Sequence, residues 1–284
     1  IYTAKNILAG REVVAKLWCL ESGQALKHEY HIQKGLSRSK GIPHVQWFST
    51  DWGTEVLVMD HLGLSLQDLM SRNCSGAFTV ETVAEIACQA ICILELIHSQ
   101  DFIHCNIKPL HLLFDSHQQN GTMYLIDFGL ACTYQHHGTH RHIPYKKQVP
   151  FVGSETFASI RALHGRQQSR HDDLKSLAYI LIYLLSRFLP WQECGLTVEE
   201  VIQAKVNIFQ SSLQDKVPTA LFTFLEYVLC WHSSFVLIMI MFRILSKISM
   251  QRQGVAALPN FLDEHCIFFL HVVVWTSCTC RVIT

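Results

Sequence analysis

The chain has 284 residues, and its 23 lysine and arginine residues balance 23 aspartate and glutamate residues, so the formal net charge is zero. That balance leaves no extended field of one sign, which argues against a surface for nucleic acid or for an acidic membrane. The length is sufficient for one large domain or for two packed lobes.

Cysteine usage indicates a reducing compartment, and the apolar runs do not indicate a membrane span. The 11 cysteines include no C-x-x-C pair, and no signal peptide opens the sequence, so a disulfide framework is not expected. The apolar runs 174–189 and 235–245 contain charged residues and fall short of the ~20 apolar residues that span a bilayer. We expect a monomeric, cytoplasmic or nuclear protein that binds neither membranes nor nucleic acid.

The first 62 residues are typical of a small lobe rich in β-strands. Residues 12–18 form a β-branched run, and the runs 45–49 and 55–59 flank an Asp-Trp-Gly turn signal, which predicts one strand followed by a hairpin. Residues 26–36 mix charged and apolar positions and predict a short helix between them.

From residue 63 the pattern becomes helical. The spacing of one helical face is followed by Val83, Ile86, Ala87, Ala90, Ile91, Leu94 and Ile97. The short apolar runs 112–114 and 124–126 predict a second hairpin, and 172–188 is apolar almost all round, as in a buried central helix. We therefore predict an α+β fold with two lobes, a small β-rich lobe over 1–62 and a larger helical lobe over 63–232.

Residues 233–284 are dense in apolar side chains but lack helix caps and amphipathic spacing. Two interpretations of this tail remain open. It is either a C-terminus foreign to the preceding domain, as a read-through or a shifted reading frame would produce, or a genuine added helix or partner-binding segment.

Two motifs in the helical region carry the chemistry. The first is Ile103-His104-Cys105-Asn106-Ile107-Lys108-Pro109, and the second is Asp127-Phe128-Gly129 after the second predicted hairpin. Together they resemble the catalytic loop and the metal-binding Asp-Phe-Gly element of protein kinases. In the small lobe, Lys16 on a predicted strand precedes Glu29 on the predicted helix, which is the order of the kinase lysine–glutamate pair.

Further segments resemble the casein kinase I family over residues 1 to about 230. These segments are Leu62-Gly63-Leu64-Ser65-Leu66-Gln67-Asp68-Leu69, His142-Ile143-Pro144-Tyr145, Phe157-Ala158-Ser159-Ile160, Gln168-Ser169-Arg170-His171-Asp172-Asp173-Leu174 and Leu189-Pro190-Trp191-Gln192. The resemblance implies a bilobal serine/threonine protein kinase domain with ATP between the lobes.

The resemblance also implies roles for single residues. The positions that it implies for ATP binding are Lys16, Glu29, the gatekeeper Met59, the hinge residues Asp60 and Leu62, Leu113 below the adenine, and Asp127. Asp127 would also bind Mg²⁺, and Lys108 would contact the γ-phosphate. We expect an ion pair between Lys16 and Glu29, and hydrogen bonds from Asp173 to the loop backbone near His104.

The departures from the kinase pattern fall on the catalytic residues. Asn106 occupies the position of the catalytic Asp, His111 that of the second metal ligand, and Cys105 that of the Arg. A neutral amide cannot take the proton of a substrate hydroxyl, and imidazole is a poor ligand for Mg²⁺. No two glycines have G-x-G spacing, so we expect the sequence to start after the phosphate-covering loop and Mg²⁺ binding to be weak or lost.

The sequence thus predicts a casein kinase I-type kinase domain that is catalytically impaired, either a pseudokinase or a decayed gene copy. One alternative is an active but slow kinase that positions Mg-ATP through Lys16, Asp127 and Lys108. The other alternative is a non-catalytic binding scaffold that acts through the helical lobe or the tail. ATP is the expected small-molecule partner, and the sequence identifies no protein substrate or protein partner.

Overall fold

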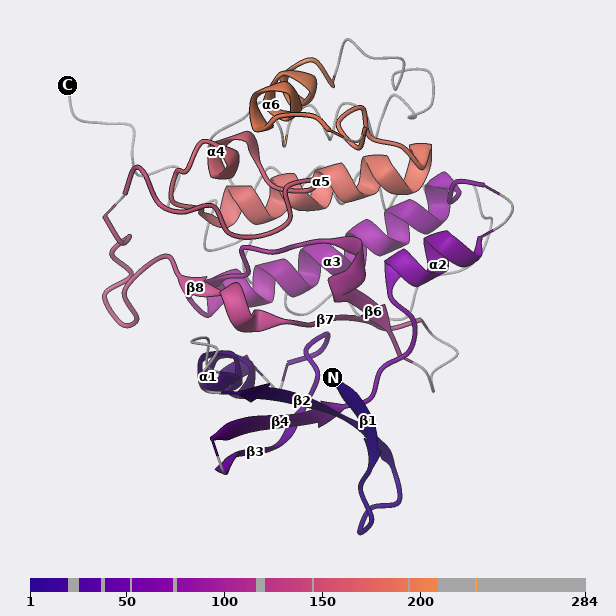
Figure 1. The fold of residues 1–284 in the computed structure, drawn as a ribbon, viewed down its shortest axis with the longest axis vertical. Coiled ribbons are helices and arrows are strands. Elements are labelled where there is room, and N and C mark those ends of the chain that lie inside the picture. Colours follow the sequence, from indigo (N-terminus) through magenta and orange to yellow (C-terminus); the bar gives the residue numbers. More distant parts are fainter. Residues whose placement is uncertain are drawn as a thin grey trace, which may run out of the picture. The chain divides into compact units, whose positions relative to one another are not determined.

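The computed structural model describes residues 1–19, 26–36, 39–51, 53–73, 76–115, 121–144, 146–193, 195–208 and 228 (Figure 1). The expectations for the tail over 233–284, for Trp52 in the first hairpin turn and for Tyr145 lie outside these residues. No helix within the described ranges is long and apolar enough to cross a membrane.

The N-terminal region forms a four-stranded antiparallel sheet in the order β1-β2-β4-β3 (Figure 1). Its strands are β1 (Tyr2–Lys5), β2 (Glu12–Cys19), β3 (Val45–Asp51) and β4 (Thr54–Asp60), and α1 (Leu26–Leu36) lies between β2 and β3 in the chain. The strands and the helix predicted for this lobe are confirmed.

The alternation of β4 explains why α1 packs on this sheet. Along β4 every second side chain is buried, including Leu57 and Met59, as expected of a strand with one face on a core. Leu57 and Met59 pack with Leu26 of α1 into the core of this lobe. Glu55, buried on the same face of β4, accepts a hydrogen bond from the Lys27 amide in the first turn of α1.

The remaining described residues form a mainly helical lobe. Its elements are α2 (Leu66–Arg72), α3 (Val80–Ser99), β5 (Phe102–Ile103), η2 (Pro109–His111), β6 (Leu112–Phe114), β7 (Met123–Leu125), η3 (Phe128–Leu130), β8 (Cys132–Thr133), α4 (Ile160–Leu163), α5 (Arg170–Ser186) and α6 (Val198–Val206). Strand β6 pairs with β7, and β5 pairs with β8. The second predicted hairpin is therefore confirmed, with its second strand one residue earlier than expected.

Two long helices, α3 and α5, form the centre of this lobe and pack on each other (Figure 1). All seven residues of the predicted face of α3 are buried. Helix α5 buries residues on every side, which confirms the prediction of a central helix. It begins with a capping box between Ser169 and Asp172 and ends at Ser186, where the C-cap residue Arg187 adopts a left-handed φ of 58° that terminates the helix. The combination of a small antiparallel sheet and a larger helical lobe confirms the predicted α+β class.

Candidate active site

A three-residue ionic cluster joins the two lobes. Lys16 of β2 places its Nζ 2.6 Å from Oε2 of Glu29 on α1 and 2.8 Å from Oδ1 of Asp127 in the helical lobe. The predicted Lys16–Glu29 ion pair is confirmed. Helix α1 also contacts η3, and the His28 ring lies 2.7 Å from the carbonyl oxygen of Ala131. The helix that carries Glu29 is thus held against the segment that follows Asp127.

The charges in this cluster depend on one another. Burial lowers the pKa of Lys16, but the carboxylates of Glu29 and Asp127 outweigh that effect, so the pKa lies above its usual 10.5. Burial raises the pKa of Glu29, and the Lys16 ammonium opposes that shift. The net effect leaves the pKa of Glu29 above its usual 4.5, and the Lys16 ammonium limits that rise.

The second oxygen of Asp127 is also occupied. His111 of η2 is buried and places Nε2 3.1 Å from Asp127 Oδ2, while its Nδ1 lies 3.0 Å from the carbonyl oxygen of Asn106. Both neighbours are acceptors, so both contacts are hydrogen bonds only when each ring nitrogen carries a proton. The hydrogen bond from His111 holds the pKa of Asp127 far below its usual 3.8; burial opposes this shift, and Lys16 reinforces it.

These residues do not fit a magnesium ion. Mg²⁺ requires near-octahedral oxygen ligands, whereas the carboxylate oxygens of Asp127 are contacted by Lys16 Nζ and by His111 Nε2. His111, at the position expected for a second ligand, presents an N–H toward Asp127 in place of an oxygen. Within the described ranges, no group of three or more His, Cys, Asp or Glu side chains could hold a metal ion.

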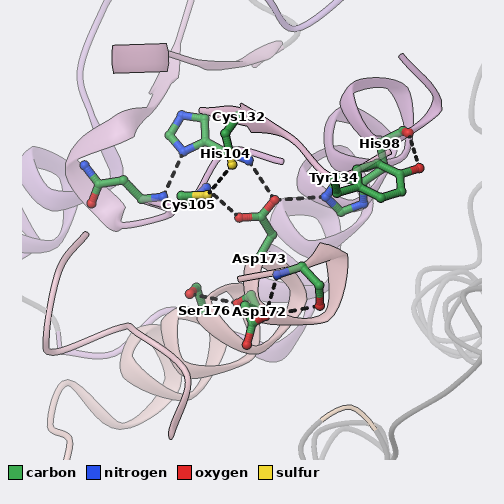
Figure 2. Close-up of polar contacts among 10 residues, drawn as sticks. His98, His104, Cys105, Cys132, Tyr134, Asp172, Asp173 and Ser176 are labelled. Carbon is green, nitrogen blue, oxygen red and sulfur yellow. Dashed lines mark hydrogen bonds and ion pairs between the residues drawn. The ribbon is translucent and has the colours of Figure 1, made fainter. Parts of the chain in front are cut away.

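The catalytic-loop backbone is held by Asp173 from α5 (Figure 2). Its Oδ2 accepts hydrogen bonds from the His104 amide and from Nε2 of His98, and its Oδ1 accepts one from the Cys105 amide, all at 2.9 Å. Asp173 is 2% exposed, so water cannot replace these bonds. The predicted contact between Asp173 and the loop backbone near His104 is confirmed.

His104 links the loop to the Asp-Phe-Gly segment. Its Nε2–H donates to the carbonyl oxygen of Ile126, and its Nδ1 accepts from the Asn106 amide. The ring packs edge-on against Phe128 with centroids 5.1 Å apart. Complete burial lowers the pKa of His104 to about 4, which matches a neutral ring that accepts at Nδ1.

The side chain of Asn106 lies buried in the loop, and its Oδ1 has no hydrogen-bond partner among the described residues. Its amide is neutral and cannot remove a proton from a hydroxyl group. Lys108, the other residue predicted to be catalytic, is half-buried in extended backbone before η2.

The residues predicted to surround the adenine lie where β4 leads into the helical lobe. Met59 is buried, while Leu62 and Leu113 are half-buried. The backbone after Leu62 is bound to β6, because the Gly63 amide donates to the Phe114 carbonyl at 2.7 Å. The carboxylate of Asp60 accepts hydrogen bonds from the His44 amide and the Gln46 side chain, and the Asp60 amide donates to the His44 carbonyl oxygen.

Sequence reasoning missed one contact in this region. The Sγ atoms of Cys105 and Cys132 lie 3.7 Å apart (Figure 2). No spacing rule connects two cysteines so far apart in the chain, and only the pairing of β5 with β8 brings them together.

Comparison with protein families agrees with this geometry. The family model described as "Protein kinase domain" matches residues 1–258 of the chain. The match extends beyond residue 232, so the boundary proposed there between the helical lobe and the tail stays a prediction. A match over most of the chain, together with the cross-lobe contact of Lys16, Glu29 and Asp127, shows that the chain belongs to the protein kinase domain family.

Proposed function

We propose that the chain is a casein kinase I-type serine/threonine kinase domain that binds nucleotide phosphates through Lys16 but is impaired in phosphoryl transfer. The observation that carries this proposal is the double occupation of Asp127 by Lys16 and His111. Kinases stabilise the transferred phosphoryl group with metal ions held by that Asp and by an Asn of the catalytic loop.

The casein kinase I assignment is supported by how the segment after the activation loop is attached. The sequence there is Phe157-Ala158-Ser159, without an acidic residue. Ser159 donates to Asp172 at 2.5 Å, and the buried Lys205 of α6 donates to the carbonyl oxygen of Ala158 at 2.6 Å. These contacts attach the segment to α5 and α6 in place of an ion pair made by a glutamate.

Lys16 retains the capacity to bind a phosphate. An ammonium group carries three N–H donors, and the carboxylates of Glu29 and Asp127 use two of them. The side chain is 20% exposed, so the remaining donor can reach a ligand. ATP, when bound, supplies the phosphoryl group, and Lys16 and Glu29 orient its phosphates.

Loss of the base lowers the rate of transfer. Asn106 can accept a hydrogen bond from a substrate hydroxyl but cannot take its proton, and general-base help of this kind is worth roughly 10²–10⁴ in rate. A second candidate function is a slow kinase in which Asn106 orients the hydroxyl without deprotonating it, which requires its buried and unpartnered Oδ1 to become accessible to substrate. Both candidates share the same nucleotide contacts and differ only in rate.

Nucleotide binding is the first test. ADP should raise the melting temperature of the purified chain equally with Mg²⁺ and with EDTA, because Asp127 is not free to hold the metal. Lys16→Met should abolish this rise. Lys5→Met, a matched change at an exposed position of the neighbouring strand β1, should leave it intact. A rise that requires Mg²⁺ would contradict the assignment of Asp127.

Phosphoryl transfer is the second test. The unmodified chain should transfer little phosphate from ATP to a peptide, and Asn106→Asp with His111→Asn should increase the rate by roughly 10²-fold or more. His111→Asn should also make the ADP-induced stabilisation depend on Mg²⁺. A family-like rate with Asn106 and His111 intact would contradict the proposed impairment.

A further inference from the structure

The thiols of Cys105 and Cys132 form a pair beside the catalytic loop. Their Sγ atoms lie 3.7 Å apart (Figure 2). Cys105 directly precedes Asn106, and Cys132 opens β8, three residues after Gly129. Cys105 is buried, whereas Cys132 is exposed.

The backbone holds both cysteines in place. The Cys105 amide donates to Asp173 at 2.9 Å, and Cys105 has a φ of 64°. Cys132 pairs with Ile103 in the β5–β8 ladder. A disulfide requires an S–S distance of about 2.05 Å. The two Sγ atoms, now 3.7 Å apart, must therefore move about 1.7 Å closer.

We propose that Cys105 and Cys132 form a site of reversible disulfide formation that reacts with small-molecule disulfides such as glutathione disulfide. The site is independent of nucleotide binding and of the proposed loss of catalysis. It rests on the pairing of one exposed and one buried thiol at van der Waals distance.

The order of the reaction follows from exposure and hydrogen bonding. The hydrogen bond from Cys105 lowers the pKa of Cys132, whereas that bond and then burial raise the pKa of Cys105. Cys132 is therefore the attacking thiolate. Its sulfur forms a bond to one sulfur of glutathione disulfide, and the first glutathione leaves as a thiolate. Cys105 then loses its proton and attacks Cys132 Sγ, which releases the second glutathione as a thiolate, so that one glutathione disulfide is reduced to two glutathione molecules as the two cysteines are oxidised.

The new bond would close the segment from Cys105 to Cys132. That segment contains His111 and Asp127, so the catalytic loop and the start of the activation segment would be joined covalently. Because a cross-link restricts the unfolded chain, the melting temperature of the oxidised protein should rise on the order of 5 °C.

Peptide mapping tests the proposal. The folded chain is treated with glutathione disulfide, alkylated, and cleaved after acidic residues, which separates the Cys105 peptide Phe102–Asp115 from the Cys132 peptide Phe128–Glu155. Each of these peptides contains a single cysteine. We expect the two peptides to be recovered as one disulfide-linked product that dithiothreitol separates. Recovery of both peptides as alkylated thiols, or of Cys132 as a stable glutathione adduct with Cys105 alkylated, would overturn the proposal.

Matched variants separate this site from general thiol oxidation. Cys132→Ser should leave Cys105 unmodified, and Cys105→Ser should trap the glutathione adduct on Cys132, because no second thiol resolves it. Cys19→Ser, which removes another exposed cysteine, should leave the linked product unchanged. Loss of the linked product in Cys19→Ser would contradict the assigned pair, and the mapping of the unmodified chain stands even if a serine variant fails to fold.

Discussion

Replacing Asp173 by Ala should destabilise the chain far more than a comparable change at another helix start. Asp173 serves three donors, the amides of His104 and Cys105 and the ring of His98, in a site where water is excluded. Leaving a buried donor unpaired costs about 1–3 kcal/mol, so we expect the free energy of unfolding to fall by about 4 kcal/mol or more. That is a large part of the roughly 5–15 kcal/mol that stabilises a typical domain.

The matched control is Asp68→Ala in the first turn of α2. Asp68 is exposed and completes a capping box with Ser65, and loss of such a cap costs about 1 kcal/mol. Urea unfolding of both variants measures the difference. Hydrogen exchange adds a local measurement, in which the His104 and Cys105 amides of Asp173→Asn should exchange faster than in the unmodified chain. If Asp173→Ala lowers the free energy of unfolding no more than Asp68→Ala does, Asp173 does not hold the catalytic loop.

Two further predictions concern the same loop. Gly153→Ala should destabilise the chain, because φ is +113° and the added Cβ would lie 2.7 Å from the Cys105 carbonyl oxygen. Gly35→Ala in α1 is the control, because its added Cβ meets no atom within 4 Å, and it should stabilise the chain slightly. Thermal melts that rank the two variants in the opposite order would contradict this prediction. Since the pKa of His104 falls to about 4 in the folded chain from 6.5, the unfolded chain binds more protons between these values, and stability should be complete above pH 6.5 and decline as the pH falls toward 4. His104→Phe should flatten this part of the urea-unfolding profile, and an unchanged slope would show that His104 does not cause it.

Local patterns in the sequence determined most of the secondary structure. The alternation of β4 and the spacing of Val83 to Ile97 on α3 depend only on which side chains face a core, so periodicity was sufficient to predict them. The kinase order of Lys16, Glu29 and Asp127 likewise predicted which side chains meet, and the structure brings them together. Their contact follows from the kinase fold, and the short motifs identify the residues that make it.

Only the tertiary structure decided what the substituted residues do. The sequence predicted His111 as a poor metal ligand, but its ring is within hydrogen-bonding distance of Asp127 and of the Asn106 carbonyl oxygen, which turns it into a competitor for the metal site. The contact between Cys105 and Cys132 depends on the β5–β8 pairing. Periodicity and motifs predict contacts between neighbours along the chain and contacts typical of the kinase fold. The partners of substituted residues such as His111 and Cys105 depend on distances that only the folded backbone determines.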